Sequence, residues 1–378
     1  MADIQGFCEP RFGAIAQLLS TSLDTNTELG ASVAITLNGE MVVDLWGGWR
    51  DAAKTMPWQQ DTITNVWSST KTVTILAALV LIDRGLLDLD SPVCTYWQEF
   101  GANGKADITI RQILSHTSGV SGWEQPIQLS DLFNWEKSTA MLAAQAPWWE
   151  PGTASGYHDH NFGHLIGEVV RRITGKSLGK FLADEIANPL KADFHIGLAR
   201  SEFDRVANVI PAPQFEVPPS LEPGTVRDKT LNGPRWYPED AWTDAWRQAE
   251  IGGANGHGNA RSLARLQALV ACGGELEGIR LLSPQTCELV VQEQIQGMDL
   301  VLGIPLRWGI GYALKNESIG YIPDGRVCLW GGWGGSVSLA DLDRRMSLSY
   351  VMNRMESNPT HFIQIIRAAY TALGIACD

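Results

Sequence analysis

Hydrophobic and polar positions along the first part of the chain follow two different periods. Apolar residues recur at helical spacing over residues 13–22, whereas residues 32–46 form two β-rich runs joined at Asn38-Gly39. An Asn-Gly pair between such runs is a strong signal of a two-residue β-hairpin. A polar stretch over 65–74 then precedes an unbroken apolar run over 75–82, which indicates a buried helix. The pattern therefore predicts a helix, a hairpin and a second helix.

The middle of the chain carries helical periodicity in three segments: 108–119, 163–175 and 178–187. In the first of these, Thr109 is placed to cap the helix and Gly119 to end it. Residues 211–238 are rich in proline and irregular, so we interpret them as a long loop of the kind that often binds ligands. We therefore expect residues 81–251 to form a mainly helical domain.

Strand character returns towards the end of the chain, in four segments: 307–314, 320–329, 337–342 and 346–352. A closing helix is predicted over 361–373. Strands at both ends of the chain with helices between them favour an α/β (α+β) fold with one antiparallel sheet flanked by helices. In this interpretation residues 1–80 and 252–378 build the sheet domain, and the helical domain is inserted between them.

Composition excludes several classes of function. The 378 residues carry a net charge of −13, which disfavours binding to nucleic acid or to an anionic membrane surface. The six cysteines are scattered without a C-x-x-C pair, so a zinc site is not expected. The N-terminus lacks the basic and apolar regions of a secretory signal, and no apolar run is long enough to span a membrane. The prediction is a cytoplasmic protein with reduced thiols and no cofactor.

The chemistry centres on Ser68 and Lys71 at the start of the second helix. Positions i and i+3 share a helix face, so Ser68, and not Ser69, can present its hydroxyl to the Lys71 amine. A lysine whose charged form is disfavoured by burial can take the serine proton and create a nucleophile. The alternative is that Ser68 caps the helix and Lys71 lies on the surface.

Two further stretches complete a candidate acyl-transfer site. Tyr157 precedes a predicted helix, and next to a cationic lysine its phenol would lose its proton more easily, so it could exchange protons with Ser68 or the leaving group. The glycine-rich stretch over 330–336 precedes a strand and could bring two backbone N–H groups to an oxyanion. Taken alone, Tyr157 could equally be a packing residue and the glycines a flexible turn.

Ser68-Ser-Thr-Lys71 matches the S-x-x-K signature of the serine β-lactamase and penicillin-binding superfamily. Five other stretches agree with this resemblance: 110–119, 149–152, 254–258, 281–284 and 350–353. The chain most resembles the class C β-lactamase-like carboxylesterases, also called family VIII esterases. The resemblance implies a β-lactamase-like fold with the site between the two domains. It also implies that Ser68 is the nucleophile and that Lys71 and Tyr157 together act as the general base.

By the same resemblance, the backbone N–H groups of Ser68 and Trp333 would form the oxyanion hole. Trp330, Gly331 and Gly332 would line the substrate site, because Trp330 stands where the lactamases carry the lysine of Lys-Thr-Gly. Asp159 stands where those enzymes carry an asparagine and would also border the substrate. Losing a cation and gaining a carboxylate disfavours an anionic β-lactam and favours a neutral, apolar ester.

The histidines suggest lesser roles. His257 lies between glycines and is a candidate for lining the substrate groove, whereas His116 is expected to be structural. His160 and His164 have the i, i+4 spacing of a metal pair, but they lack a Glu-x-x motif, so we expect packing roles and no metal. The fifteen tryptophans are explained either by core packing or by an aromatic-walled pocket.

These observations predict a serine hydrolase that cleaves small carboxylic esters through an acyl-enzyme on Ser68. One alternative is an acyltransferase that moves the acyl group to an alcohol or amine, because a tryptophan-rich cleft can exclude water. A second is weak β-lactamase or D-peptidase activity. A third is a binding protein on this fold without catalytic activity.

Overall fold

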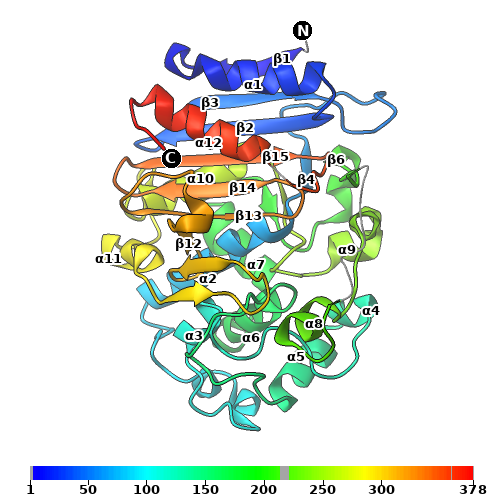
Figure 1. Ribbon diagram of the computed structural model, residues 1–378, viewed down its shortest axis with the longest axis vertical. Helices are drawn as coiled ribbons and strands as arrows, with labels where there is room; N and C mark the ends of the chain where they lie inside the picture. Colours follow the sequence, from blue (N-terminus) through cyan, green and yellow to red (C-terminus); the bar gives the residue numbers. More distant parts are fainter. Residues whose placement is uncertain (1–2, 213–220, 359, 378) are drawn as a thin grey trace.

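The computed structural model describes residues 3–212, 221–358 and 360–377. Nine strands form one antiparallel sheet in the order β1-β3-β2-β15-β14-β13-β12-β11-β10 (Figure 1). Their bounds are β1 Ile4–Cys8, β2 Gly30–Leu37, β3 Glu40–Gly48, β10 Ile295–Met298, β11 Pro305–Trp308, β12 Ala313–Leu314, β13 Val327–Gly331, β14 Val337–Asp341 and β15 Met346–Met352. Because β15 pairs with β2, the two ends of the chain share one sheet, which confirms the predicted fold class.

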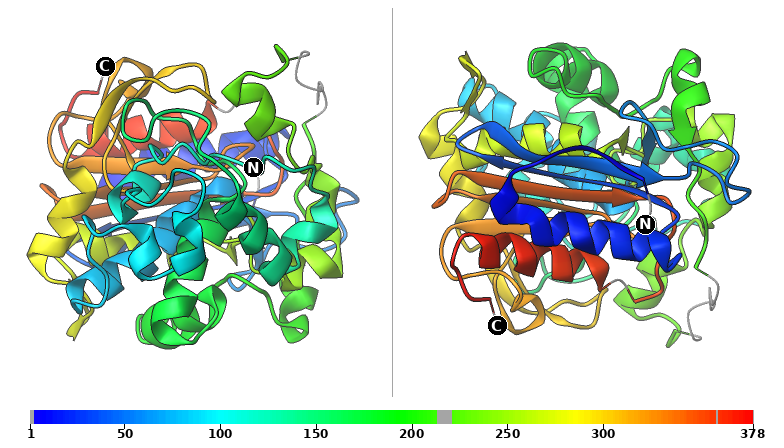
Figure 2. Two further views of the ribbon diagram at one scale, coloured as in Figure 1. Left: turned by 90° about the horizontal axis from the view of Figure 1, so that it is seen from below. Right: turned by 90° about the horizontal axis from the view of Figure 1, so that it is seen from above.

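Helices cover both faces of this sheet. Figure 2, right, shows α1 (Gly13–Asp24) and α12 (His361–Ala372) side by side on one face. On the other face α10 (Ala260–Ala271) packs across β2, β14 and β15. The sheet is therefore the middle of three layers, and its strands are mostly buried.

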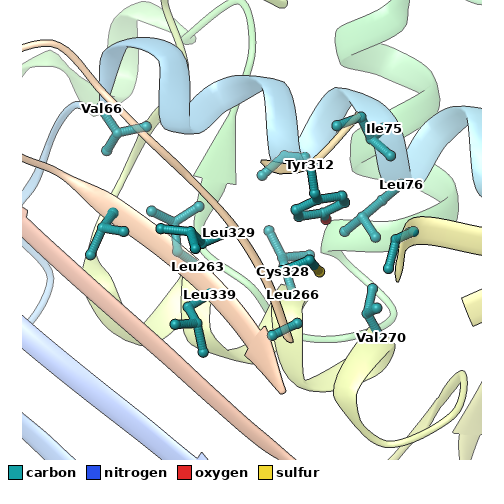
Figure 3. Close-up of a cluster of buried hydrophobic side chains, with 14 of the residues drawn as sticks. Val66, Ile75, Leu76, Leu263, Leu266, Val270, Tyr312, Cys328, Leu329 and Leu339 are labelled. Atoms are coloured by element: carbon teal, nitrogen blue, oxygen red, sulfur yellow. The ribbon is translucent and has the colours of Figure 1, made fainter. Parts of the chain in front are cut away.

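The helix α2 (Thr70–Asp83) lies in the core and carries the candidate lysine. All residues from Thr70 to Leu81 are buried, which explains why its apolar run shows no amphipathic pattern. Figure 3 shows where α2 meets α10 and the sheet, with Val66, Ile75, Leu76, Leu263, Leu266, Val270, Tyr312, Cys328, Leu329 and Leu339 labelled. The hydroxyl of Tyr312 lies 3.1 Å from the Thr72 carbonyl and 2.9 Å from Oε1 of Gln267, so this cluster has one satisfied polar group.

In the sequence, most of the other helices lie between the N-terminal and the C-terminal strands of the large sheet. They are α3 Ile110–Leu114, α4 Leu129–Leu132, α5 Trp135–Ala144, α6 Phe162–Thr174, α7 Leu178–Leu182, α8 Val226–Leu231, α9 Asp244–Gln248 and α11 Pro284–Glu288. Both α6 and α7 pack against α2. The predicted boundary at residue 80 falls inside α2, and the division into two domains remains a prediction.

Two small sheets complete the structure. A four-stranded sheet has the order β5-β7-β4-β6, with bounds β4 Ile63–Asn65, β5 Phe194–His195, β6 Val206–Ala207 and β7 His257–Gly258. It ties the helical segment to the strand that leads into Ser68. A separate hairpin joins β8 (Glu275–Leu276) to β9 (Ile279–Arg280). Among the described residues, none of the helices combines the length and apolar character needed to cross a membrane.

Several predicted elements are confirmed. Asn38 and Gly39 join β2 to β3 with φ angles of 52° and 84°, as a two-residue hairpin turn of this type requires. The helix α6 ends at Gly175, which is left-handed with φ 70°. The closing helix α12 and the strands β14 and β15 lie where the pattern placed them.

Other predicted boundaries are wrong. Thr109 caps α3 as expected, but the helix ends after Leu114 and not at Gly119. The Ser115 hydroxyl bonds the Arg111 carbonyl and His116 adopts φ 61°, so the chain turns away early.

The late strand predicted over 320–329 begins only at Val327, because proline and glycine at 323–325 interrupt it. In the predicted loop 211–238, residues 226–231 form α8, and residues 213–220 lie outside the described part of the chain.

Candidate active site

The chain enters the site through a short turn between β4 and α2. Residues Trp67–Ser69 form one turn of 3₁₀ helix, with Ser68 half-buried and Ser69 buried. Trp67 has φ 49°, which is rare for a bulky side chain and is typical of strained turns at functional sites. Because Lys71 follows Ser68 by three positions, its Nζ reaches to 3.1 Å from the Ser68 Oγ.

The Lys71 amine is fully buried and held by two backbone carbonyls. Its Nζ donates to the carbonyl oxygens of Asp159 at 2.7 Å and Gly253 at 2.8 Å. Burial lowers the pKa of Lys71 to about 7, although the negative charge of Asp159 acts in the opposite direction. A neutral amine has two N–H donors and one lone pair. With both donors on carbonyls, the lone pair faces the Ser68 hydroxyl.

The phenol of Tyr157 is the next group near Ser68. The Ser68 side chain interacts with the phenol and acts to lower its pKa, and the Trp330 indole N–H donates to the Tyr157 oxygen at 2.9 Å. The Nζ of Lys71 lies 4.7 Å from the centre of its ring. Burial, followed by the charge of Asp159, raises the pKa of Tyr157 well above its usual value. This direction is opposite to our expectation, because burial penalises a phenolate more than its neighbours favour it.

Neighbouring rings and a buried carboxylate hold Tyr157 in place. The Trp308 ring is parallel to the Tyr157 ring, at 3° and with centres 6.1 Å apart, and the His116 ring lies 5.1 Å away. The backbone N–H of Tyr157 donates to Oδ1 of Asp299 at 3.0 Å. Sequence reasoning missed Asp299 and Trp308. The one available signal was an aspartate set between the apolar residues Met298 and Leu300.

The glycine-rich stretch after β13 packs against the nucleophile turn. The Ser336 hydroxyl donates to the Val66 carbonyl at 2.8 Å and lies 2.9 Å from the Ser69 hydroxyl. A Cβ atom on Gly332 would lie only 2.2 Å from the Val66 carbonyl oxygen, so this approach requires glycine. The Trp333 ring contacts the Trp67 ring edge-on at 4.9 Å, which brings residue 333 beside the Ser68 turn.

The remaining residues that were predicted to line the substrate site differ in burial and contacts. Trp330, Gly331 and Gly332 are half-buried at the end of β13, and Trp330 contacts Tyr157 directly. The Asp159 side chain is 24% exposed and lies 3.4 Å from Nε2 of His160. His257 is fully buried in β7, with Nδ1 2.8 Å from the Asn255 carbonyl, and so presents no surface to a groove.

The i, i+4 histidines have different surroundings. The His160 ring meets the Trp236 ring at 3.8 Å, whereas His164 stacks on Trp135 and lies 3.1 Å from the Leu132 carbonyl. Within the described ranges, no group of three or more His, Cys, Asp or Glu residues could hold a metal ion.

This arrangement of a serine, a buried lysine and a tyrosine can be compared with known proteins. A protein-family model described as Beta-lactamase matches residues 15–373. The chain belongs to the Beta-lactamase family. The Beta-lactamase family match covers both the sheet and the helical segment, and it includes each of the candidate catalytic residues.

Individual members of this family are similar to the chain over most of its length. Esterase/beta-lactamase LipL of Mycobacterium tuberculosis is 33% identical, over 93% of this chain and 83% of LipL. The crystal structure of a family VIII carboxylesterase is 38% identical with a TM-score of 0.91, covering 98% of this chain and 100% of that one. A penicillin-binding protein homologue from Caulobacter crescentus is 36% identical, with the same TM-score and coverage. These similarities confirm the predicted resemblance and place the chain among the serine hydrolases of this fold.

Proposed function

We propose that this protein hydrolyses small carboxylic esters through an acyl-enzyme on Ser68, with Lys71 and Tyr157 as the proton-transfer pair. The observation that carries the proposal is the Lys71 amine, which is buried, held by two carbonyls and 3.1 Å from the Ser68 Oγ. A lysine with a pKa of about 7 is a usable base at neutral pH.

In the first step the neutral Lys71 amine takes the Ser68 proton as Oγ bonds to the ester carbonyl carbon. The carbonyl π electrons move to its oxygen, which the backbone N–H groups of Ser68 and Trp333 would stabilise. Each such donor lowers the barrier by about 3 kcal/mol. The contacts of the 330–336 stretch with the Ser68 turn support this placement.

The tetrahedral intermediate then collapses. The alkoxide leaves with a proton from the Lys71–Tyr157 pair, and the acyl group stays on Ser68. Because its pKa is raised, Tyr157 starts as a neutral phenol and not as a phenolate, so it relays a proton within the pair while Lys71 is the base. In the second half-reaction, water loses a proton to the same pair and attacks the acyl carbon. Ser68 leaves and recovers its hydrogen.

A neutral ester is the favoured substrate. Trp330 offers an indole N–H and an aromatic face where a β-lactamase offers a cation, and its N–H is already bonded to Tyr157. The Asp159 carboxylate repels an anionic substrate. The half-buried rings of Trp333 and Trp236 pack on the buried rings of Trp67 and Trp246 beside the nucleophile turn, and the exposed parts of Trp333 and Trp236 suit an apolar acyl or alkoxy group. The names of the family VIII carboxylesterase and of LipL agree with esterase activity.

The test is hydrolysis of short-chain p-nitrophenyl esters together with the mass of the intact protein. We expect turnover, and an acyl adduct when hydrolysis is slowed by low temperature. The Ser68→Ala variant should lose both the turnover and the adduct while keeping its melting temperature. Full activity in Ser68→Ala would overturn the proposal.

A further inference from the structure

The turn after β10 contains a buried carboxylate that reaches the Tyr157 backbone. Asp299 is fully buried. Its Oδ1 accepts the backbone N–H groups of Tyr157, Val301 and Leu302, each at 3.0 Å. Its Oδ2 faces the Trp308 indole N–H at 3.4 Å. These four donors are neutral N–H groups, a set that suits an ionised carboxylate.

The same turn is fastened to the Tyr157 segment through its backbone. The Leu300 N–H donates to the Ser155 carbonyl at 2.8 Å, two residues before Tyr157. The Asp299 N–H donates to the Ile304 carbonyl at 3.0 Å, which closes the turn. Asp299 therefore links the β10–β11 hairpin to the loop that presents the phenol.

Asp299 also connects the two rings that border the phenol. The Trp308 ring lies parallel to the Tyr157 ring and 4.7 Å from the Trp330 ring. Trp330 in turn donates to the Tyr157 oxygen at 2.9 Å. One carboxylate thus sets the backbone of Tyr157 directly and its ring position through Trp308.

We infer that Asp299 is a positioning residue for the proposed hydrolase, which fixes the Tyr157 segment directly and, through Trp308, the ring that carries the phenol. The inference rests on the proposed function for its mechanistic meaning, but the geometry is independent of it. Removing the carboxylate should release the backbone of the Tyr157 segment, and lengthening the side chain should misplace the phenol.

Other charged or titratable groups also face Tyr157. Lys71 lies over its ring, Asp159 raises its pKa more strongly than Asp299 does, and the His116 ring packs against it. His116 and His158 are neutral near pH 7, because burial lowers the pKa of His116 well below its usual value and that of His158 to about 4. These groups set the charge around the phenol, whereas Asp299 sets the position of the segment that carries it.

The experiment follows the position of Tyr157 through its ring-carbon resonance, in protein labelled with isotope-enriched tyrosine and with the resonance assigned from Tyr157→Phe. In Asp299→Ala we expect that resonance to move and kcat for ester hydrolysis to fall about a hundredfold with KM little changed, because the phenol acts in proton transfer. An unmoved resonance or an unchanged kcat would overturn the inference even if the esters are cleaved. Absence of ester cleavage in the parent protein would instead overturn the proposed function.

A second variant separates charge from position. Asp299→Glu keeps the charge but adds a methylene, so we expect kcat to fall about a hundredfold although the charge is retained. Full kcat in Asp299→Glu would contradict a positioning role, and this result stands even if Asp299→Ala fails to fold. The matched control is Asp341→Asn, which removes another fully buried carboxylate, bonded to Arg344 and Tyr370. It should alter the melting temperature but neither the Tyr157 resonance nor kcat.

Discussion

The Lys71 Nζ and the Ser68 Oγ lie 3.1 Å apart, and the carbonyls of Asp159 and Gly253 occupy the other positions around the amine. The remaining position around the Lys71 nitrogen therefore faces the Ser68 hydroxyl. Because the two carbonyls come from segments far apart in the sequence, the orientation of the base depends on the whole fold and not on the helix alone.

The first prediction concerns pH. Below about pH 7 Lys71 is an ammonium and cannot accept the Ser68 proton, whereas above it the neutral amine can. We expect kcat/KM for a neutral ester to rise through a limb near pH 7. Steady-state rates across the neutral range, at constant ionic strength, measure this limb. A limb in the range of an ordinary carboxyl group would contradict Lys71 as the base.

The second prediction removes the base. Lys71→Met keeps a long apolar side chain but has no amine, so kcat should fall by a factor of about 10²–10⁴. The matched control is Lys105→Met, because Lys105 is also fully buried and its Nζ donates to the carbonyls of Ala102, Ala143 and Gln145. Both variants should lose stability, measured by thermal unfolding, but only Lys71→Met should lose turnover per folded molecule. Equal losses of turnover in the two would refute a specific role for Lys71.

Local patterns explain which features could be predicted from the sequence. The Ser68–Lys71 contact follows from helix periodicity, and the β2–β3 hairpin follows from Asn38-Gly39, since both depend on neighbours in the chain. The approach of Tyr157 to Ser68 joins distant segments, and it was predictable only through the family resemblance.

The features that were missed lack a local signal. The strands β1 and β10 lie at the two edges of the large sheet, are short, and both contain Gln-Gly, so neither shows an alternating pattern. The carbonyls that orient Lys71 are backbone groups, which any residue would supply. His257 was proposed as groove-lining because glycines flank it, but those glycines make room for the Phe194 ring instead.

The third prediction concerns the indole that replaces the lactamase cation. Trp330→Phe keeps the aromatic face but loses the N–H bonded to the Tyr157 oxygen, so kcat should fall about tenfold, as for the loss of one hydrogen bond. Trp135→Phe is the control, since it removes an indole N–H donated to Glu168 on the helical segment. It should leave ester turnover unchanged. An equal effect of the two substitutions on kcat would show that the Trp330 N–H has no special role.

The same position tests the substrate preference. Trp330→Lys supplies a cation where a β-lactam carboxylate would lie, so hydrolysis of the chromogenic β-lactam nitrocefin should rise relative to ester hydrolysis. The ratio of the two kcat/KM values is the measurement. A ratio that stays at the parent level would contradict the view that the lack of a cation at residue 330 disfavours β-lactams.

The last prediction concerns the close approach of the glycine-rich stretch to the nucleophile turn. In Gly332→Ala the new methyl would lie 2.2 Å from the Val66 carbonyl oxygen and 2.3 Å from the Ser336 hydroxyl, so the stretch must move away. The backbone N–H of the next residue, Trp333, would then leave the oxyanion, and kcat should fall by a factor of about 10²–10³. KM should change much less, because Trp236 and Trp67 lie on other segments and stay in place.

Gly320→Ala is the matched control, because a Cβ atom at Gly320 meets no other atom within 4 Å. Its kcat should equal that of the parent protein. Stopped-flow measurement of the acylation burst locates the effect, which should lie in the formation of the acyl-enzyme as well as in its hydrolysis, since both steps pass through an oxyanion. If Gly332→Ala acylates at the parent rate, the oxyanion is held elsewhere and the proposed oxyanion hole is wrong.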